Sequence, residues 1–140
     1  MNKLKKFAAV AAICSLICSC SSSERERRDA LIGAFRLHVG SDCSEENIDY
    51  ARLLLRADGT YFQEGRFKNG TSYAIDAKRW RYQSGDFILL EGFRMNSAVS
   101  GPMQKEVADV KLAIDFRESG IYIILIPGQN CFFVKEAIVR

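Results

Sequence analysis

The sequence contains very little histidine, proline or tryptophan. Of its 140 residues, one is His, two are Pro and one is Trp. A Ser-His-Asp or Cys-His catalytic arrangement would have to use His38, and the chain has no Gly-x-Ser-x-Gly motif to place a nucleophile. It also has no glycine-rich phosphate-binding loop and no set of side chains suited to a metal ion. We therefore expect a protein that is not an enzyme and uses no cofactor, with His38 on the surface.

The first 19 residues have the composition of an export signal. Three lysines precede an apolar run, residues 7–17, which is too short to cross a bilayer as a stable helix. The stretch from Ile17 to Cys20, ICSC, resembles the lipobox of bacterial lipoproteins, in which the cysteine is acylated and the signal peptide is cleaved before it. The resemblance implies a signal peptide over residues 1–19 and a membrane anchor on Cys20. Ser21, in place of Asp, resembles the pattern that directs lipoproteins of many Gram-negative bacteria to the outer membrane.

Cleavage of this segment leaves a chain without net charge. The sequence has 20 Lys and Arg and 17 Asp and Glu, but three lysines and no acidic residues lie in residues 1–19, so 17 charges of each sign remain. Balanced charge gives no reason to expect nucleic acid as a partner. Residues 20–30 are polar, which predicts a lipidated tether with one helical turn at its end. The folded domain is expected over residues 31–140.

Alternating apolar and polar side chains predict about eight short β-strands in the folded domain. The alternation is clearest from Val110 to Phe116, where every second residue is apolar. Short strands, short loops and the lack of a convincing long helix predict an all-β antiparallel meander, closed or nearly closed into a barrel. The strands are expected over residues 31–39, 50–57, 61–67, 73–82, 87–93, 107–117 and 131–138, with one more between turns at Ser119 and Pro127.

The turn at Asp58-Gly59 is the strongest local signal in the chain, because a glycine that accepts positive φ lets two strands fold back tightly. Its register stays open, since three consecutive leucines precede it. A two-residue loop would pair Leu55 with Phe62. A three-residue loop would pair Ala57 with Tyr61.

A second hairpin is expected to turn from Gln83 to Asp86. A four-residue loop there would place Tyr82 opposite Phe87 and Trp80 opposite Leu89, so that these four side chains share one buried face. A turn at Ser119-Gly120 gives two further expected pairs, Phe116 with Ile123 and Ile114 with Leu125.

One pattern runs through the centre of the chain: Leu53-x-Leu55-x-x-Asp58-Gly59-Thr60-Tyr61, then Trp80, then Gly85-Asp86-x-Ile88-x-Leu90. It resembles the small lipocalin-like β domains of bacterial lipoproteins, and Gly33-x-Phe35 resembles their opening strand. Lys78 differs from this pattern, because these domains usually carry Gly two residues before the Trp. The resemblance implies a lipocalin-like barrel, and it concerns the fold far more than the function.

A barrel of this size either fills itself with side chains or holds one small ligand. The strands carry enough aromatic residues to fill it, and Trp80 would then be a core anchor. If a cavity remains, a small apolar or amphipathic ligand is expected to bind among Leu55, Trp80, Tyr82 and Leu89.

Contact with another protein of the cell envelope, as an assembly partner or an inhibitor, is the alternative function. A cationic stripe on the face opposite Trp80 would serve it, formed by Arg52, Arg56, Arg79 and Arg81. Three acidic residues, Glu64, Asp76 and Glu91, could instead neutralise these arginines on a solvated face. The irregular segment from Arg94 to Glu106 is a further candidate contact surface.

Two cysteines remain in the folded domain once Cys20 is acylated and the signal peptide is removed. Disulfides persist in exported proteins, so Cys43 and Cys131 are expected to form a bridge between the first long loop and the last strand. Two free thiols or a metal pair are the alternatives, although two cysteines and one histidine make a poor metal site.

Overall fold

The structure is a computed structural model that describes residues 23–43, 47–94 and 107–137. The chain divides into two compact units after Ala30, and every strand of the described residues lies in the second unit, Leu31–Arg140. Residues 23–30 of the first unit are helical, more than the single turn expected, because Glu and Arg are good helix formers. No helix in the described part of the chain is long and apolar enough to cross a membrane. The expected signal peptide and Cys20 lie outside the described residues.

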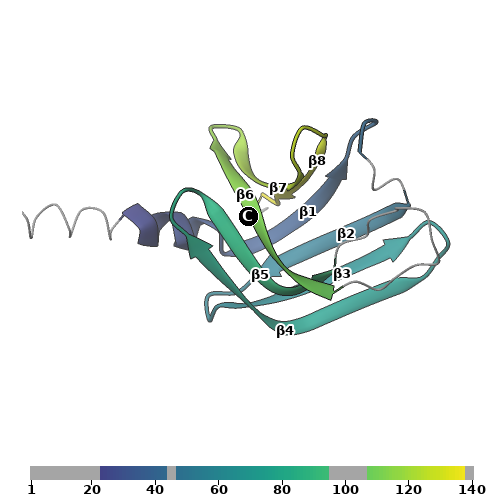
Figure 1. Ribbon diagram of the computed structural model, residues 1–140, viewed down its shortest axis with the longest axis horizontal. Helices are drawn as coiled ribbons and strands as arrows, with labels where there is room; N and C mark the ends of the chain where they lie inside the picture. Colours follow the sequence, from purple (N-terminus) through teal and green to yellow (C-terminus); the bar gives the residue numbers. More distant parts are fainter. Residues whose placement is uncertain (1–22, 44–46, 95–106, 138–140) are drawn as a thin grey trace, which may run out of the picture. The chain divides into compact units, whose positions relative to one another are not determined.

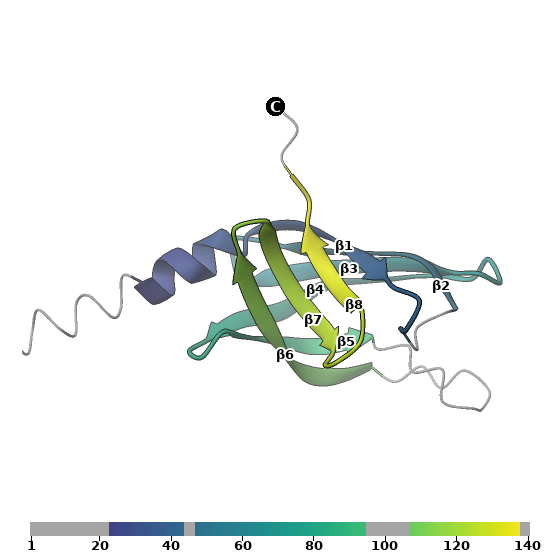
Figure 2. The same ribbon diagram turned by 90° about the horizontal axis from the view of Figure 1, so that it is seen from above.

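Eight antiparallel strands form a closed barrel in chain order, and the last strand pairs with the first (Figures 1 and 2). This arrangement confirms the expected all-β meander barrel. The strands are β1 Gly33–Val39, β2 Ile48–Leu55, β3 Thr60–Phe67, β4 Ser72–Gln83, β5 Phe87–Arg94, β6 Val107–Arg117, β7 Gly120–Ile126 and β8 Cys131–Lys135.

The β2–β3 turn takes neither of the two registers considered from the sequence. Leu55 lies opposite Tyr61, because the loop consists of residues 57–59 and is closed by a hydrogen bond from the Arg56 N–H to the Thr60 carbonyl (2.9 Å). Gly59 has a φ of 82°, which suits glycine at this position. As a result Leu55 and Tyr61 both point into the barrel and are fully buried.

The expected pairing of β4 with β5 is wrong by one residue. Gln83 lies opposite Phe87 and Trp80 lies opposite Leu90, so the loop has three residues instead of four. The shorter loop is possible because Gly85 and Asp86 both take positive φ, 86° and 60°. A shift of one residue exchanges the two faces of a strand. Leu90 therefore packs inside the barrel with Trp80, whereas Leu89 lies on the outer face.

The β6–β7 turn also differs from the expectation, but without exchanging the faces. Ile114 lies opposite Ile123 and Phe116 lies opposite Ile121, because the turn occurs one residue earlier than Ser119-Gly120. Moving a two-residue turn by one position shifts the register by two, which keeps the same side chains inside. Ile114 and Ile123 are accordingly both buried.

Aromatic side chains fill the interior. Tyr61, Phe35, Phe93 and Phe133 are the largest side chains that are less than 2% exposed, and they come from β3, β1, β5 and β8. Phe93 and Phe133 meet edge to face, with ring centroids 6.2 Å apart. Sixteen further hydrophobic residues are buried with these four in one core cluster. Side chains from all around the barrel thus meet at its centre.

The sheet is continuous between β4 and β5 only near their turn. These strands pair over residues 80–83 of β4, and a bulge at residues 76 and 77 turns the first half of β4 away. Ala77 has a φ of 56° in this bulge, one residue before Lys78, where the lipocalin-like domains usually carry Gly. The β3–β4 hairpin runs on past the end of β5 (Figures 1 and 2).

Two side chains of β3 take the place of the missing β4 backbone. The Tyr61 hydroxyl donates to the Glu91 carbonyl (2.7 Å), and burial raises the pKa of Tyr61, which keeps this donor protonated. The Gln63 amide donates to the Arg94 carbonyl and accepts from the Arg94 N–H, both at 3.0 Å. Gln63 is the one buried polar or charged residue among those described, 1% exposed. Side chains therefore satisfy the backbone of β5 where β4 has left it.

The expected disulfide between Cys43 and Cys131 is present, with the two Cα atoms 5.4 Å apart. It joins the loop after β1 to the start of β8. The Gly40 N–H donates to the Asn130 carbonyl (2.7 Å) beside it, and both cysteines are buried. The bridge thus fastens the junction between the first and last strands, where the barrel closes.

Candidate functional site

The four residues expected to bind a small apolar ligand do not share one surface. Leu55 is fully buried and Trp80 is 4% exposed, and both pack within the core. The Trp80 indole N–H donates to the Arg56 carbonyl (2.9 Å), so the polar group of the ring is already bonded. Tyr82 donates its hydroxyl to Asp86 (2.8 Å), and Leu89 lies on the outer face. Trp80 is therefore a core anchor in this structure.

The four arginines expected to form one stripe are separated. Arg52 lies on β2 and Arg56 directly follows it, and β3 stands between β2 and β4, which carries the other two. Arg52 pairs with Glu136 at 2.9 Å, and Arg56 pairs with Asp76 at 2.8 Å. Of the acidic residues expected to neutralise them, Asp76 does so, whereas Glu64 accepts a hydrogen bond from Tyr50 (2.8 Å). Arg79 and Arg81 belong to a different site.

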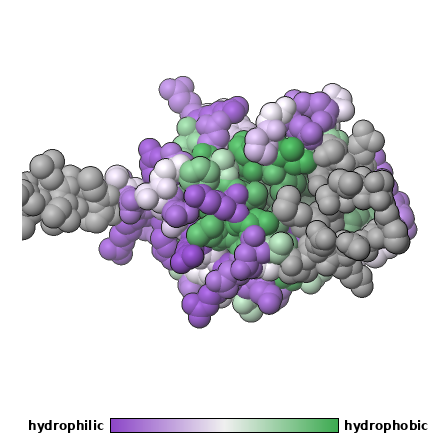
Figure 3. Space-filling model, in the orientation of Figure 1, coloured by the Kyte–Doolittle hydropathy of each residue, from purple (hydrophilic) through white to green (hydrophobic). Residues whose placement is uncertain are grey.

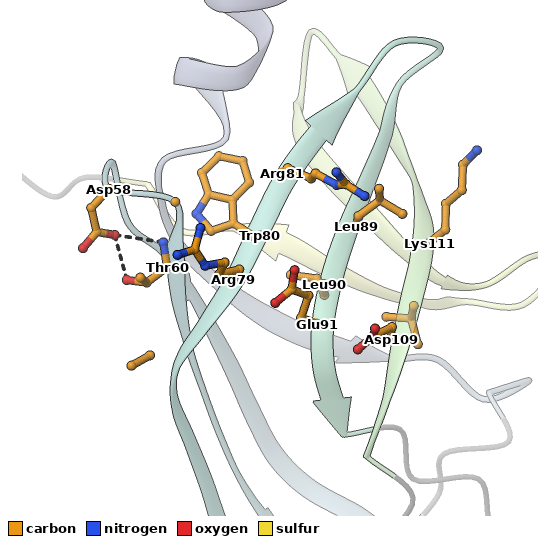
Figure 4. A pocket seen from close by; sticks show the side chains of 13 residues that line it. Asp58, Thr60, Arg79, Trp80, Arg81, Leu89, Leu90, Glu91, Asp109 and Lys111 are labelled. Carbon is orange, nitrogen blue, oxygen red and sulfur yellow. Dashed lines mark hydrogen bonds between the residues drawn. The ribbon is translucent and has the colours of Figure 1, made fainter.

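The remaining two arginines line a pocket of about 570 Å³ on the outer side of β4, β5 and β6. The turn between β2 and β3 forms one wall of it (Figure 4). Polar side chains from Asp58, Thr60, Arg79, Arg81, Glu91, Asp109 and Lys111 line the pocket together with Leu89.

A row of three side chains crosses this pocket from strand to strand. Arg81 lies opposite Leu89, and Leu89 lies opposite Lys111 on its other side, as Figure 4 shows. The register thus places one cation on each side of an apolar group. Lys111 Nζ also lies 4.2 Å from the centre of the Phe87 ring, which holds the ammonium near the surface of the sheet. We refer to Arg81, Leu89 and Lys111 as the cationic row.

Two of the three acidic residues that line the pocket, Asp58 and Asp109, accept hydrogen bonds within the chain, and the third, Glu91, is exposed. Asp58 Oδ1 accepts hydrogen bonds from the Thr60 hydroxyl (2.7 Å) and the Thr60 N–H (2.8 Å), and these bonds hold the pKa of Asp58 below its usual value. Asp109 Oδ1 accepts from the Gly92 N–H (2.9 Å). Within the described ranges, Arg81 forms no ion pair with any of these carboxylates. Arg81 and Lys111 are both exposed, so the two cations of the row can meet an external group.

A second hollow, of about 680 Å³, lies on the outer side of β2, β3 and the first half of β4. Ser72, Tyr73 and Ala74 form its β4 side. The ring of Tyr73 packs on Gly65, where a Cβ atom would come within 2.6 Å of it. Arg94 lies over the same ring, with its guanidinium carbon 4.7 Å from the ring centre. Both hollows therefore border β4.

Other candidates from the sequence give no site. His38 is exposed and stacks on Phe132, with centroids 4.8 Å apart. No group of three or more His, Cys, Asp or Glu side chains in the described segments is arranged to hold a metal ion. The segment after Arg94, residues 95–106, lies outside the described residues.

Lys111 and Asp109 were not anticipated as site residues. Both stand at outward positions of the alternating pattern in β6, and only the observed β5–β6 register brings Lys111 beside Leu89. Comparisons of the chain with protein families, with curated proteins and with solved structures found no match.

Proposed function

We propose that this protein is a lipid-anchored binding module of the cell envelope that contacts another protein through the outer surface of β4, β5 and β6. The cationic row carries this proposal: Arg81 and Lys111 flank Leu89 across three adjacent strands. Such a row suits a partner that offers carboxylates on either side of an apolar group. The proposal assigns no catalytic step to the protein.

A filled interior favours this function over the binding of a small apolar ligand within the barrel. Such a ligand would have to displace side chains around Leu55 and Trp80, which are 0% and 4% exposed. Emptying a well-packed core of that kind costs several kcal/mol per large side chain. The outer surface offers binding groups without this cost.

The anchor is supported by the sequence from Ile17 to Cys20. We expect the intact mass of the protein, extracted with detergent from its native membrane, to match a chain that starts at Cys20 and carries acyl groups. The same spectrum should show the loss of two hydrogens for the Cys43–Cys131 bridge. A Cys20→Ala variant serves as the control and should stay uncleaved and without lipid. A native mass that fits any other first residue would rule out the anchor.

Reversing the charge of the row should weaken partner binding strongly. In the R81E/K111E variant we expect at least about 30-fold weaker binding, because two attractive contacts become repulsive. A photo-reactive residue at position 89 can trap the partner on intact cells, and the yield of the adduct measures the loss. The K68E/R117E variant makes the same change in net charge away from the pocket and should keep the full yield. Equal adduct yields from both variants would show that the partner does not bind through the cationic row.

A further inference from the structure

β4 offers an unpaired strand edge beside the proposed site. Residues 72–79 pair with β3 on one side, and β5 joins β4 only from Trp80 onward. Most side chains of this stretch are exposed, including those of Ser72, Ala74 and Arg79. Within the described part of the barrel, no other strand pairs with this edge.

The direction of the backbone groups follows from the hydrogen bond at the end of the hairpin. The Phe67 N–H donates to the Thr71 carbonyl (2.8 Å), which fixes Phe67 and Thr71 as a hydrogen-bonded pair. Backbone groups alternate in direction along an antiparallel strand. Tyr73 therefore points its N–H and C=O toward β3, and Ser72 and Ala74 point theirs toward the open side.

β5 does not compete for this edge. The β5 backbone at Glu91 and Arg94, which would otherwise pair with β4, is already bonded to Tyr61 and Gln63. An open edge with unbonded donors and acceptors is a template for one more strand. The pocket at residues 77–81 borders the end of the same stretch.

We propose that an extended, acidic segment of the partner protein adds to β4 as a further strand. This inference rests on the proposed function and names the way in which the partner binds. Charge complementarity selects an acidic segment: Lys78 and Arg79 are exposed at the end of the edge, and the cationic row follows directly. The one acid of the edge, Asp76, is already paired with Arg56. Small side chains at Ser72, Ala74 and Ala77 let another backbone approach closely.

Amide hydrogen exchange on the full chain tests the added strand directly. The probe is a synthetic peptide of alternating Glu and Val, and the control peptide has Lys in place of Glu. At saturation with the acidic peptide, we expect the Ser72 and Ala74 amides to exchange at least about tenfold more slowly, because they gain backbone hydrogen bonds. If the acidic peptide does not bind, or binds without slowing the exchange of these two amides, the proposal of an added strand is wrong.

A backbone substitution separates this inference from the proposed function. Ala74→Pro removes an N–H that points away from β3, a position where an edge strand tolerates proline. We expect about tenfold weaker peptide binding, as for one lost hydrogen bond, while Ala74→Val binds as the wild type does. If Ala74→Pro binds the peptide unchanged while R81E/K111E binds it more weakly, the partner docks on the surface without adding a strand. That result would reject the added strand and leave the proposed function in place. Protection of the Ser72 and Ala74 amides in a dimer of the free chain would show that a second copy occupies the edge, which also rejects it.

Discussion

Replacing Cys43 and Cys131 together by alanine is expected to lower the free energy of unfolding by about 4 to 5 kcal/mol. The bridge closes a loop between residues 88 positions apart, so its loss gives the unfolded chain much more conformational freedom. It also fastens the place where β8 meets β1. Among the changes considered, this one has the largest expected effect on stability.

Denaturant unfolding, followed by the fluorescence of Trp80, measures this loss. Trp80 is the single tryptophan and is 4% exposed in the fold, so its emission reports the barrel core. Wild-type protein in the presence of a reductant should unfold at the same denaturant concentration as the double variant. A difference below about 1 kcal/mol between the oxidised wild type and the variant would mean that the bridge does not restrain the fold.

Gln63→Leu is expected to destabilise the barrel by about 2 to 5 kcal/mol, because it leaves a buried donor and a buried acceptor unbonded. The side chain is 1% exposed and bonds both the N–H and the C=O of Arg94 at 3.0 Å. Leucine has a similar size but offers neither bond. The end of β5 would then be paired with β6 on one side only, since β4 has turned away from the other, and local opening there should increase.

Gln83→Leu provides the matched control, since Gln83 is an exposed residue at the end of β4. It should change the free energy of unfolding by less than about 0.5 kcal/mol. Both variants can be compared by denaturant unfolding and by hydrogen exchange of the Arg94 amide, which should accelerate only in Gln63→Leu. Equal stabilities of the two variants would contradict the role assigned to Gln63.

The alternation of side chains predicted most inner and outer positions correctly. In β6, the alternation predicted that Ile114 points inward. This stayed correct although the predicted β6–β7 register was wrong, because the register differed by two residues. In β5, the predicted register differed from the observed one by one residue, so the prediction placed Leu89 on the wrong face. The strand pattern near Leu89 is too uniformly apolar to reveal its face, so the turn length alone had to decide it.

The prediction of the candidate site was limited by the same uncertainty in strand register. Arg79 and Arg81 could be identified as outward cations from their spacing with Trp80, and the structure keeps them outward. Their neighbours could not be identified, because Lys111 reaches the pocket only through the β5–β6 register. The open edge of β4 was also hidden, since no local pattern shows where a partner strand stops.

The sequence by itself determined an antiparallel meander of eight strands and the Cys43–Cys131 bridge, because alternation, turn residues and an even cysteine pair act locally or by simple counting. Only the tertiary structure decided the registers and the filled core. It also decided that Tyr61 and Gln63 bond the backbone of β5 in place of β4. These features join strands that are distant in sequence, and a one-residue difference in a loop, too small to read from composition, changes which groups meet.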